Sequence, residues 1–394
     1  MTDAETVFGW AQLYFQSGDY VNARKWYAKR VEIDGADPET FLAKHRLAVS
    51  MHKLGELWPE VQDAYLQAWA FCPARAEPLH AVAREYRSTG RYHLGYLFAR
   101  RAAALPPPAG DQLAVDAEVY TWRALDELAV CAAWIGKKAE AFNLCRELIA
   151  LPTVPESARE RIAKNRDFEV PTMLETTTVY SETMVNNVGV GGSVADVTVS
   201  LIARSDRTTV ERTLNSFLSC CQDRSLIQRF LVLDTGLSNE DRQALCERYR
   251  FIEVIQADPH SSPGDQLREL RSHVAGRFWL HLGYGWQFFA SDKLISRLKA
   301  VLVAEPQVFQ VGVNIGDVTE LVGKCAPESA VHRAVGTGRY VRASAIVLGP
   351  AMFDTFRLDQ ASTVMAAHAD CTRELDGMAF RTATLDEVLC TVHA

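Results

Sequence analysis

Four glycine-centred turns interrupt the helical pattern of apolar positions in the first part of the chain. The turns lie at Gly18, Gly55, Gly90 and Gly136, with spacings of 37, 35 and 46 residues. An apolar-periodic segment precedes each turn and another follows it, which predicts a pair of helices around every glycine. A period of about 34 residues with two helices per unit indicates a stacked array of helical repeats.

Small residues recur at fixed positions relative to these turns. They are Ala11, Ala48, Ala83 and Ala129 before the turns, and Ala23, Val61, Gly95 and Ala141 after them. Small side chains let neighbouring helices approach closely. An unrelated helical bundle is the alternative, but it does not require four turns to agree in this way. The pattern resembles tetratricopeptide repeats and predicts a helical array over residues 1–168.

The array has two further features that bear on function. The third spacing is long because a proline-rich segment, 106–122, is inserted, and its proline run predicts a stiff extended connector. Solenoids of this kind present a surface that binds a protein or peptide. We therefore expect a protein partner at the repeats, although the same surface could pack against the next domain or form a homodimer.

The pattern changes to alternating strands and helices after a linker at 169–195 that is rich in Thr, Val and Gly. Apolar runs predict strands at 197–203, 230–234, 251–257, 277–282 and 308–314. Amphipathic segments between them predict helices, the first capped by Thr208 with Glu211 and the second capped by Ser238. This alternation predicts a mostly parallel, doubly wound α/β domain over residues 196–394.

Glycines and polar residues follow the predicted strands at their carboxyl ends, where doubly wound sheets bind their ligands. The candidate binding residues are Ala203, Arg204, Asp234, Gly283, Tyr284 and Gly285 at these ends, together with Arg268 on the helix before the fourth strand. Because the carboxyl ends of parallel strands share one edge of a sheet, we expect these residues to lie near one another.

Three segments carry a resemblance to family-2-type glycosyltransferases of the GT-A fold. They are VTVSLIARSDRTTVERTLNSFLSC, LVLDTGLSNED and QLRELRSHVAGRFWLHLGYGWQFF, in that order along the chain. The resemblance implies a GT-A-like domain that takes a nucleoside diphosphate sugar. It further implies that Ala203 and Arg204 belong to the nucleotide loop and that Asp234 contacts the nucleobase or ribose.

The sequence departs from that family at the metal site. Where the family has two acidic residues that hold Mg²⁺ or Mn²⁺ on the diphosphate, this chain has Gly283, Tyr284 and Gly285. Glycine has no side chain to ligate a metal, so the divalent cation has no carboxylate ligand here. Two outcomes follow. Arginines such as Arg204 and Arg268 replace the metal, or the site is degenerate and the chain serves as a noncatalytic scaffold or partner subunit.

Catalytic candidates are fewer than binding candidates. Inverting transfer needs a carboxylate base near the acceptor hydroxyl, and the segment GPAMFDTFRLDQ offers Asp354 and Asp359 in the region where the family places acceptor-side residues. Each of them could equally be a helix cap or a surface charge. His281 alternates with apolar residues, which favours a structural histidine over a ligand.

Composition adds limits on class and compartment. The 394 residues have 42 Lys+Arg and 49 Asp+Glu, a formal charge of −7, which gives no overall basic footprint for nucleic acid. There is no apolar run of about 18 residues, which predicts no membrane span, and no signal-peptide pattern. The nine cysteines form no CxxC pair, which favours buried reduced thiols. We expect a cytoplasmic protein.

Overall fold

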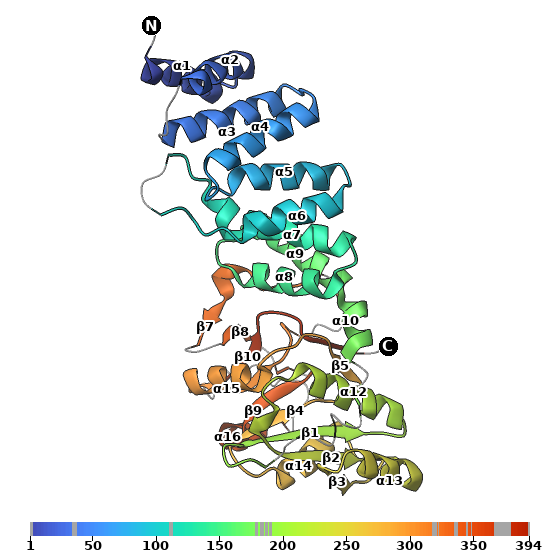
Figure 1. The fold of residues 1–394 in the computed structure, drawn as a ribbon. Helices are drawn as coiled ribbons and strands as arrows, with labels where there is room; N and C mark the ends of the chain where they lie inside the picture. Colours follow the sequence, from blue (N-terminus) through green and yellow to red (C-terminus); the bar gives the residue numbers. More distant parts are fainter. Residues whose placement is uncertain are drawn as a thin grey trace. The chain divides into compact units, whose positions relative to one another are not determined.

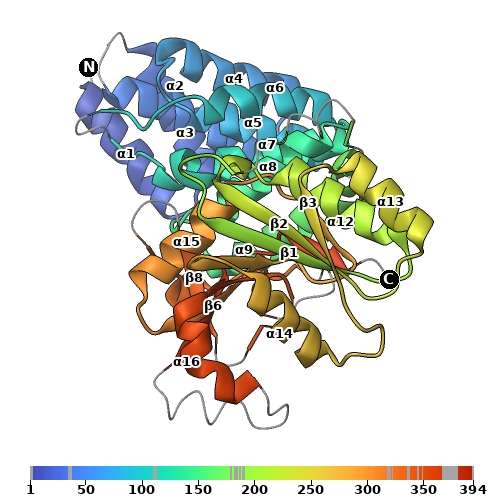
Figure 2. The same cartoon turned by 90° about the horizontal axis from the view of Figure 1, so that it is seen from below.

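The computed structural model divides the chain into two compact units, Met1–Ala158 and Arg159–Ala394 (Figures 1 and 2). It describes residues 3–33, 38–109, 113–177, 180–181, 185, 188, 191–316, 321, 323–334, 338–343, 346–347, 349–365 and 380–392. Cys371 lies outside these residues. The boundaries expected from the sequence, at 168 and 196, stay a prediction.

The N-terminal unit consists of four pairs of helices. They are α1 (Ala4–Gln16), α2 (Tyr20–Glu32), α3 (Pro38–Lys53), α4 (Trp58–Phe71), α5 (Glu77–Ser88), α6 (Tyr92–Ala103), α7 (Ala124–Trp134) and α8 (Lys138–Ala150). Each turn glycine joins the two helices of a pair in a left-handed conformation, with φ between 71° and 82°. After Gly18, for example, the Asp19 N–H donates to the carbonyl of Tyr14 at 3.0 Å, which closes a Schellman cap.

The small residues are where the helices converge. Ala11, Ala48 and Ala83 are fully buried. The closest approach is at Gly95 of α6, where an added Cβ would lie 2.8 Å from Cys131 Sγ of α7 and 3.3 Å from the Ala83 carbonyl of α5. Three helices therefore meet at a point that only glycine fits without a shift of its neighbours.

A buried ion pair ties the inserted segment to α5. Arg75 and Glu77 are 2% and 5% exposed, and their side chains meet at 2.7 Å. The Tyr120 hydroxyl donates to Glu77 at 2.6 Å, while Arg75 donates to the carbonyls of Leu113 and Ala114. The segment is not extended throughout, because a π-helical turn at Val119–Arg123 leads directly into α7.

The C-terminal unit is built on a nine-stranded sheet with the order β3-β2-β1-β4-β9-β6-β10-β8-β7. The strands of the unit are β1 (Val197–Ala203), β2 (Ile227–Asp234), β3 (Ile252–Gln256), β4 (Phe278–His281), β5 (Trp286–Phe288), β6 (Val308–Gly312), β7 (His332–Arg333), β8 (Arg339–Ala343), β9 (Ala351–Asp354), β10 (Arg381–Leu385) and β11 (Cys390–Val392). A separate two-stranded sheet pairs β5 with β11.

The sheet is mixed rather than mostly parallel. The five strands expected from the sequence are present as β1, β2, β3, β4 and β6, but β9 lies between β4 and β6 and is antiparallel to both. It was missed because its four residues, AMFD, show neither a long apolar run nor an alternating pattern.

Helices cover both faces of the sheet. They are α12 (Arg207–Cys220), α13 (Asn239–Arg248), α14 (Pro263–His273), α15 (Leu294–Ala304) and α16 (Thr355–Met365). The helices α9 (Glu156–Phe168) and α10 (Val170–Thr177) precede them in the chain. Figures 1 and 2 show α12 and α14 on opposite sides of β1 and β2. The expected linker therefore contains a helix, α10, which its threonines did not indicate.

The close approach at Gly95 gives a stability test of the helical array. We expect Gly95→Leu to lower the free energy of unfolding of the N-terminal unit by about 1–3 kcal/mol, because the larger side chain overlaps Cys131 and the α5 backbone. The matched control is Gly9→Ala in α1, where an added Cβ meets nothing within 4 Å. That change should raise stability by about 0.5–1 kcal/mol. Urea unfolding followed by circular dichroism measures both, and a neutral Gly95→Leu would contradict this packing.

Candidate functional site

The candidate site lies at the point where the strand order of the sheet reverses. The chain builds β1, β2 and β3 outward on one side, then crosses back to place β4 on the other side of β1. Ala203 is level with Asp234 across β1 and β2, and Ser200 is level with His281 across β1 and β4. The carboxyl ends of all three strands therefore share one edge, and ligands of open α/β sheets bind where the connections diverge there.

An arginine and a tyrosine meet at this reversal point. The guanidinium carbon of Arg204, directly after β1, lies 4.7 Å from the ring centroid of Tyr284, which follows β4. Arg204 is exposed and Tyr284 is half-buried. Within the described part of the chain, neither side chain makes a hydrogen bond or ion pair. The charge of Arg204 is thus positioned by a ring face but not neutralised by a carboxylate.

The backbone conformation of the 283–285 turn requires its glycines. Gly283 and Gly285 have φ of +70° and +76°. A Cβ on Gly283 would lie 3.0 Å from Cδ1 of Trp286, and a Cβ on Gly285 would lie 3.8 Å from Cγ2 of Thr209 at the start of α12. The turn therefore lies against Trp286 and the first turn of α12, and side chains at 283 would be strained and crowded.

The carboxylate of Asp234 is hydrogen-bonded within its own loop. It accepts hydrogen bonds from the N–H groups of Gly236 and Leu237, at 3.0 and 2.8 Å, and from Arg242 Nε at 2.5 Å. The residue is only 2% exposed. Asp234 therefore organises the loop after β2, and it reaches a ligand only if Arg242 moves.

The loop after β1 is fixed by Asp206. Its carboxylate accepts from the N–H groups of Thr208 and Thr209, so Asp206 caps α12 and the sequence-based choice of Thr208 was wrong. The side-chain hydrogen bond from Thr209 is the largest of the contacts that lower the pKa of Asp206. Thr235 adds a second tie, because its hydroxyl and N–H both donate to the Ala203 carbonyl.

The structure does not bring Asp354 and Asp359 to this edge. Asp354 pairs with Phe278 at the amino end of β4, because β9 runs antiparallel to β4. Phe278 is in turn level with Val197, six residues before Ala203, or about 20 Å at ~3.3 Å per residue. Asp359 lies with Arg271 near the end of α14, at 2.6 Å. Arg268 is exposed and pairs with Asp265.

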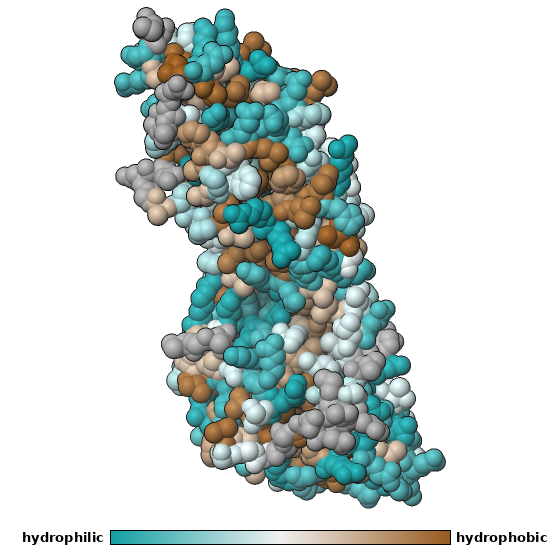
Figure 3. All heavy atoms as spheres, viewed as in Figure 1, coloured by the Kyte–Doolittle hydropathy of each residue, from teal (hydrophilic) through white to brown (hydrophobic). Residues whose placement is uncertain are grey.

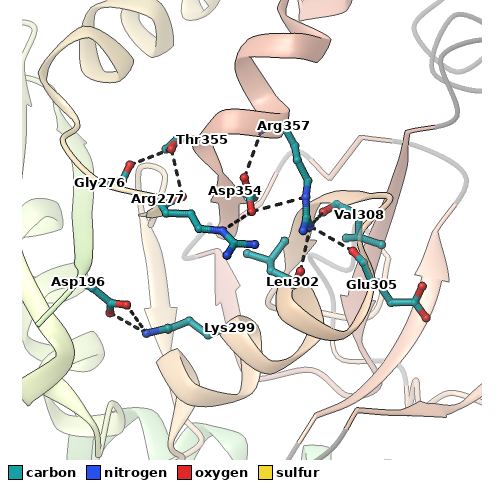
Figure 4. A network of polar contacts seen from close by, with 10 residues as sticks. All are labelled: Asp196, Gly276, Arg277, Lys299, Leu302, Glu305, Val308, Asp354, Thr355 and Arg357. Atoms are coloured by element: carbon teal, nitrogen blue, oxygen red, sulfur yellow. Dashed lines mark hydrogen bonds and ion pairs between the residues drawn. The ribbon is translucent and has the colours of Figure 1, made fainter. Parts of the chain in front are cut away.

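Asp354 has a structural role at the opposite edge (Figure 4). It is 1% exposed and binds Arg277 Nε at 2.8 Å and the N–H of Arg357 at 3.2 Å. The Arg357 guanidinium donates to three carbonyls, those of Leu302, Glu305 and Val308, which joins α15 to β6. Burial lowers the pKa of Arg357.

Sequence reasoning missed a charged cluster at the same edge as Arg204. Asp386 and Glu387 follow β10, which is parallel to β6, and both are nearly buried. Arg297 of α15 binds them at 3.3 and 2.8 Å. Burial raises the pKa of Asp386, and the neighbouring Glu387 raises it further. The sequence contains a signal for this cluster, because Asp386 and Glu387 directly follow the run RTATL. This run forms a strand that the sequence analysis did not predict.

Asn314, after β6, also serves the protein itself. Its amide donates to the Cys390 carbonyl at 2.7 Å and accepts from the N–H groups of Leu389 and Cys390. It therefore joins the end of β6 to the start of β11. Of the predicted residues at this edge, the structure leaves Arg204, Tyr284 and Gly283 at least partly exposed, whereas Gly285 is buried.

Among the described residues, no group of three or more His, Cys, Asp or Glu side chains could hold a metal ion. The same residues contain no helix that is long and apolar enough to cross a membrane.

Comparisons with known proteins give partial structural similarities. No family model and no curated protein sequence matches the chain. Solved structures with tetratricopeptide-like repeats match the N-terminal region. MamA from Desulfovibrio magneticus RS-1 has 11% identity, a TM-score of 0.35, and coverage of 44% of this chain and 86% of its own. YrrB, a TPR protein with an unusual peptide-binding site, has 15% identity, a TM-score of 0.34, and coverage of 43% and 77%.

A third solved structure is that of GalNAc-T7 with UDP, GalNAc and Mn²⁺. It has 10% identity and a TM-score of 0.38, and the match covers 49% of this chain and 42% of GalNAc-T7. This chain therefore spans less than half of that protein's length.

The buried histidine on β4 gives a pH test. Trp279 Nε1 donates to Ser200 Oγ at 2.7 Å, and Ser200 Oγ shares a hydrogen bond with His281 Nδ1 at 2.9 Å. Burial lowers the pKa of His281 to about 4. The unfolded chain therefore binds a proton near its ordinary pKa of ~6.5 while the folded chain does not, so stability is full above pH ~6.5 and falls as the pH drops towards 4.

We expect His281→Asn to flatten the pH dependence of unfolding between pH 6.5 and 5, because Asn keeps an acceptor for Ser200 without a titrating ring. The wild-type slope should exceed that of the variant by up to about 1.4 kcal/mol per pH unit. Urea unfolding at a series of pH values measures the slopes. His260→Asn, at an exposed position, is the control. Equal slopes for wild type and His281→Asn would contradict the burial of a neutral ring.

Proposed function

We propose that the C-terminal unit binds a nucleoside diphosphate sugar at the shared carboxyl edge of β1, β2 and β4, in a GT-A-like site. The observation that carries the proposal is the Arg204–Tyr284 pair at the reversal of strand order. A guanidinium that no described carboxylate neutralises is suited to a pyrophosphate, which it contacts with two parallel N–H groups. Gly283, which is half-buried and has no side chain, supports a close approach of that group to the backbone.

The residues at this edge do not fit the divalent cation that the resemblance implies. Gly283 and Gly285 have no ligating side chains, and their backbone conformation disfavours replacement by aspartate. Charge on a leaving diphosphate would have to be offset by Arg204. The proposed site is therefore independent of Mg²⁺ and Mn²⁺, and transfer of the sugar to an acceptor would proceed without a metal.

A second candidate function is a degenerate, noncatalytic glycosyltransferase-like partner subunit. Two observations favour it. Asp234, the proposed nucleoside contact, is already bound to Arg242, and the base candidate Asp354 is paired with the opposite end of β4. In that case the helical array binds protein, as a partner or as a homodimer, and the C-terminal unit contributes structure only.

Titration calorimetry with UDP, GDP and their sugars tests the binding. We expect saturable binding of at least one nucleotide that is unchanged by EDTA and weakened about tenfold or more in Arg204→Ala, because a charge-assisted bidentate contact is lost. Arg381→Ala is the matched control, since Arg381 is exposed and begins β10 at the opposite edge of the sheet.

The two functions give different results. Binding followed by release of free nucleotide from a nucleotide sugar supports the enzyme, and binding without release supports a degenerate site. Dependence on Mn²⁺, or equal affinity in wild type and Arg204→Ala, would refute the arginine-based site. Failure of every nucleotide to bind would leave the partner-subunit function.

A further inference from the structure

Helix α6 of the N-terminal unit has an exposed face with two leucines at its centre. Leu94 and Leu97 are 40% and 61% exposed and lie three residues apart, so they are neighbours on one side of the helix. Figure 3 shows apolar residues gathered with hydrophilic ones over the region of α5, α6 and α7. Exposed apolar residues are common on protein surfaces, so what this pair can bind depends on the residues around it.

Arginines surround the two leucines. Arg91, Arg100 and Arg101 are all exposed, and no acidic residue occurs between Tyr92 and Ala103. Within the described residues, none of these three side chains makes an ion pair or hydrogen bond. Other arginines of the same unit are paired, such as Arg24 with Glu56 and Arg87 with Glu127. The α6 face, defined as Arg91, Leu94, Leu97, Arg100 and Arg101, is therefore apolar at its centre and cationic at its margin.

We propose that the α6 face docks an acidic amphipathic helix of a partner protein. Leucines one turn apart match the apolar stripe of a helix laid against them. Guanidinium groups on both sides would pair with carboxylates that flank this stripe, which gives orientation and speeds association. The inference concerns the array alone and does not depend on nucleotide binding at the C-terminal unit.

Charge argues against an anionic membrane as the occupant. A bilayer is an extended surface that faces much of the molecule, and the whole chain has a formal charge of −7. A partner helix would cover only the α6 face. Charges elsewhere on the chain that lie more than a Debye length of about 8 Å from this helix are largely screened from it. Two leucines also bury little apolar surface in a bilayer.

A second copy of the chain fits less well. The exposed apolar residues Trp10 and Leu13 are in α1, which has the acidic residues Asp3 and Glu5 at its start, and could meet the α6 face of another copy. A twofold dimer would have to make this contact twice, with α1 of each copy against α6 of the other, while both copies carry a formal charge of −7.

The test uses the full chain and a fluorescein-labelled helical peptide of about 18 residues, long enough to form a helix. The peptide has leucines every three or four residues and glutamates between them, and a second peptide has lysines in place of the glutamates. Fluorescence anisotropy measures binding. We expect saturable binding of the glutamate peptide that weakens with added salt, and at least tenfold weaker binding by the double variant Arg100→Glu, Arg101→Glu.

The variant Leu94→Ser, Leu97→Ser should also lose binding, which separates a docking face from simple charge attraction. The control, Lys25→Glu with Arg381→Glu, changes the net charge equally at exposed positions elsewhere and should bind as the wild type does. Circular dichroism unfolding verifies that each variant is folded.

Three results would overturn the proposal. One is equal binding of the lysine peptide, and another is unchanged binding by the arginine variant. The third is evidence for another occupant of the α6 face. This would be sedimentation of the chain with phosphatidylserine vesicles, or self-association of the chain in ultracentrifugation, that the double variant Arg100→Glu, Arg101→Glu abolishes.

Discussion

The pairing of β1 with a strand on each side is the interaction on which the C-terminal unit depends. All seven residues of β1 are buried, and its two ladders fix the register of β2 and β4. Because parallel registers align the strand ends, they set Ala203, Asp234 and the 283–285 turn at one edge. Any ligand chemistry at this edge follows from the alignment of β1, since the residues concerned are far apart in the chain.

The sequence was informative wherever burial itself leaves a pattern. The run Val197–Ala203 was predicted with its observed bounds because a strand covered on both faces is apolar throughout. The turn glycines were predicted because a left-handed cap selects glycine. Strand direction is different, because it depends on partners that are distant in sequence. Nothing in AMFD indicates that β9 is antiparallel, so the position of Asp354 could not be derived.

The partners of charged side chains were equally invisible in the sequence. Asp234 was placed correctly after a strand, but its contact with Arg242 depends on how α13 folds back over the loop. Arg297 pairs with Asp292, from the segment before α15, and with Asp386, from the segment after β10, and only the tertiary structure brings the two segments together. In a chain that pairs most of its arginines, those that meet no carboxylate are the ones left to bind something else.

The glycines of the 283–285 turn show why the site has to be argued from Arg204 rather than from a lost metal. Both adopt left-handed φ, and Trp286 packs against Gly283 and Gly349 together. Trp286 also begins β5, which pairs with β11. The shape of the turn is therefore held by packing that extends through a second sheet, and an aspartate at 283 would have to displace the indole ring. Since the backbone of the 283–285 turn disfavours acidic ligands, the charge that this turn and the end of β1 offer to an anion comes from the guanidinium of Arg204, which lies against Tyr284.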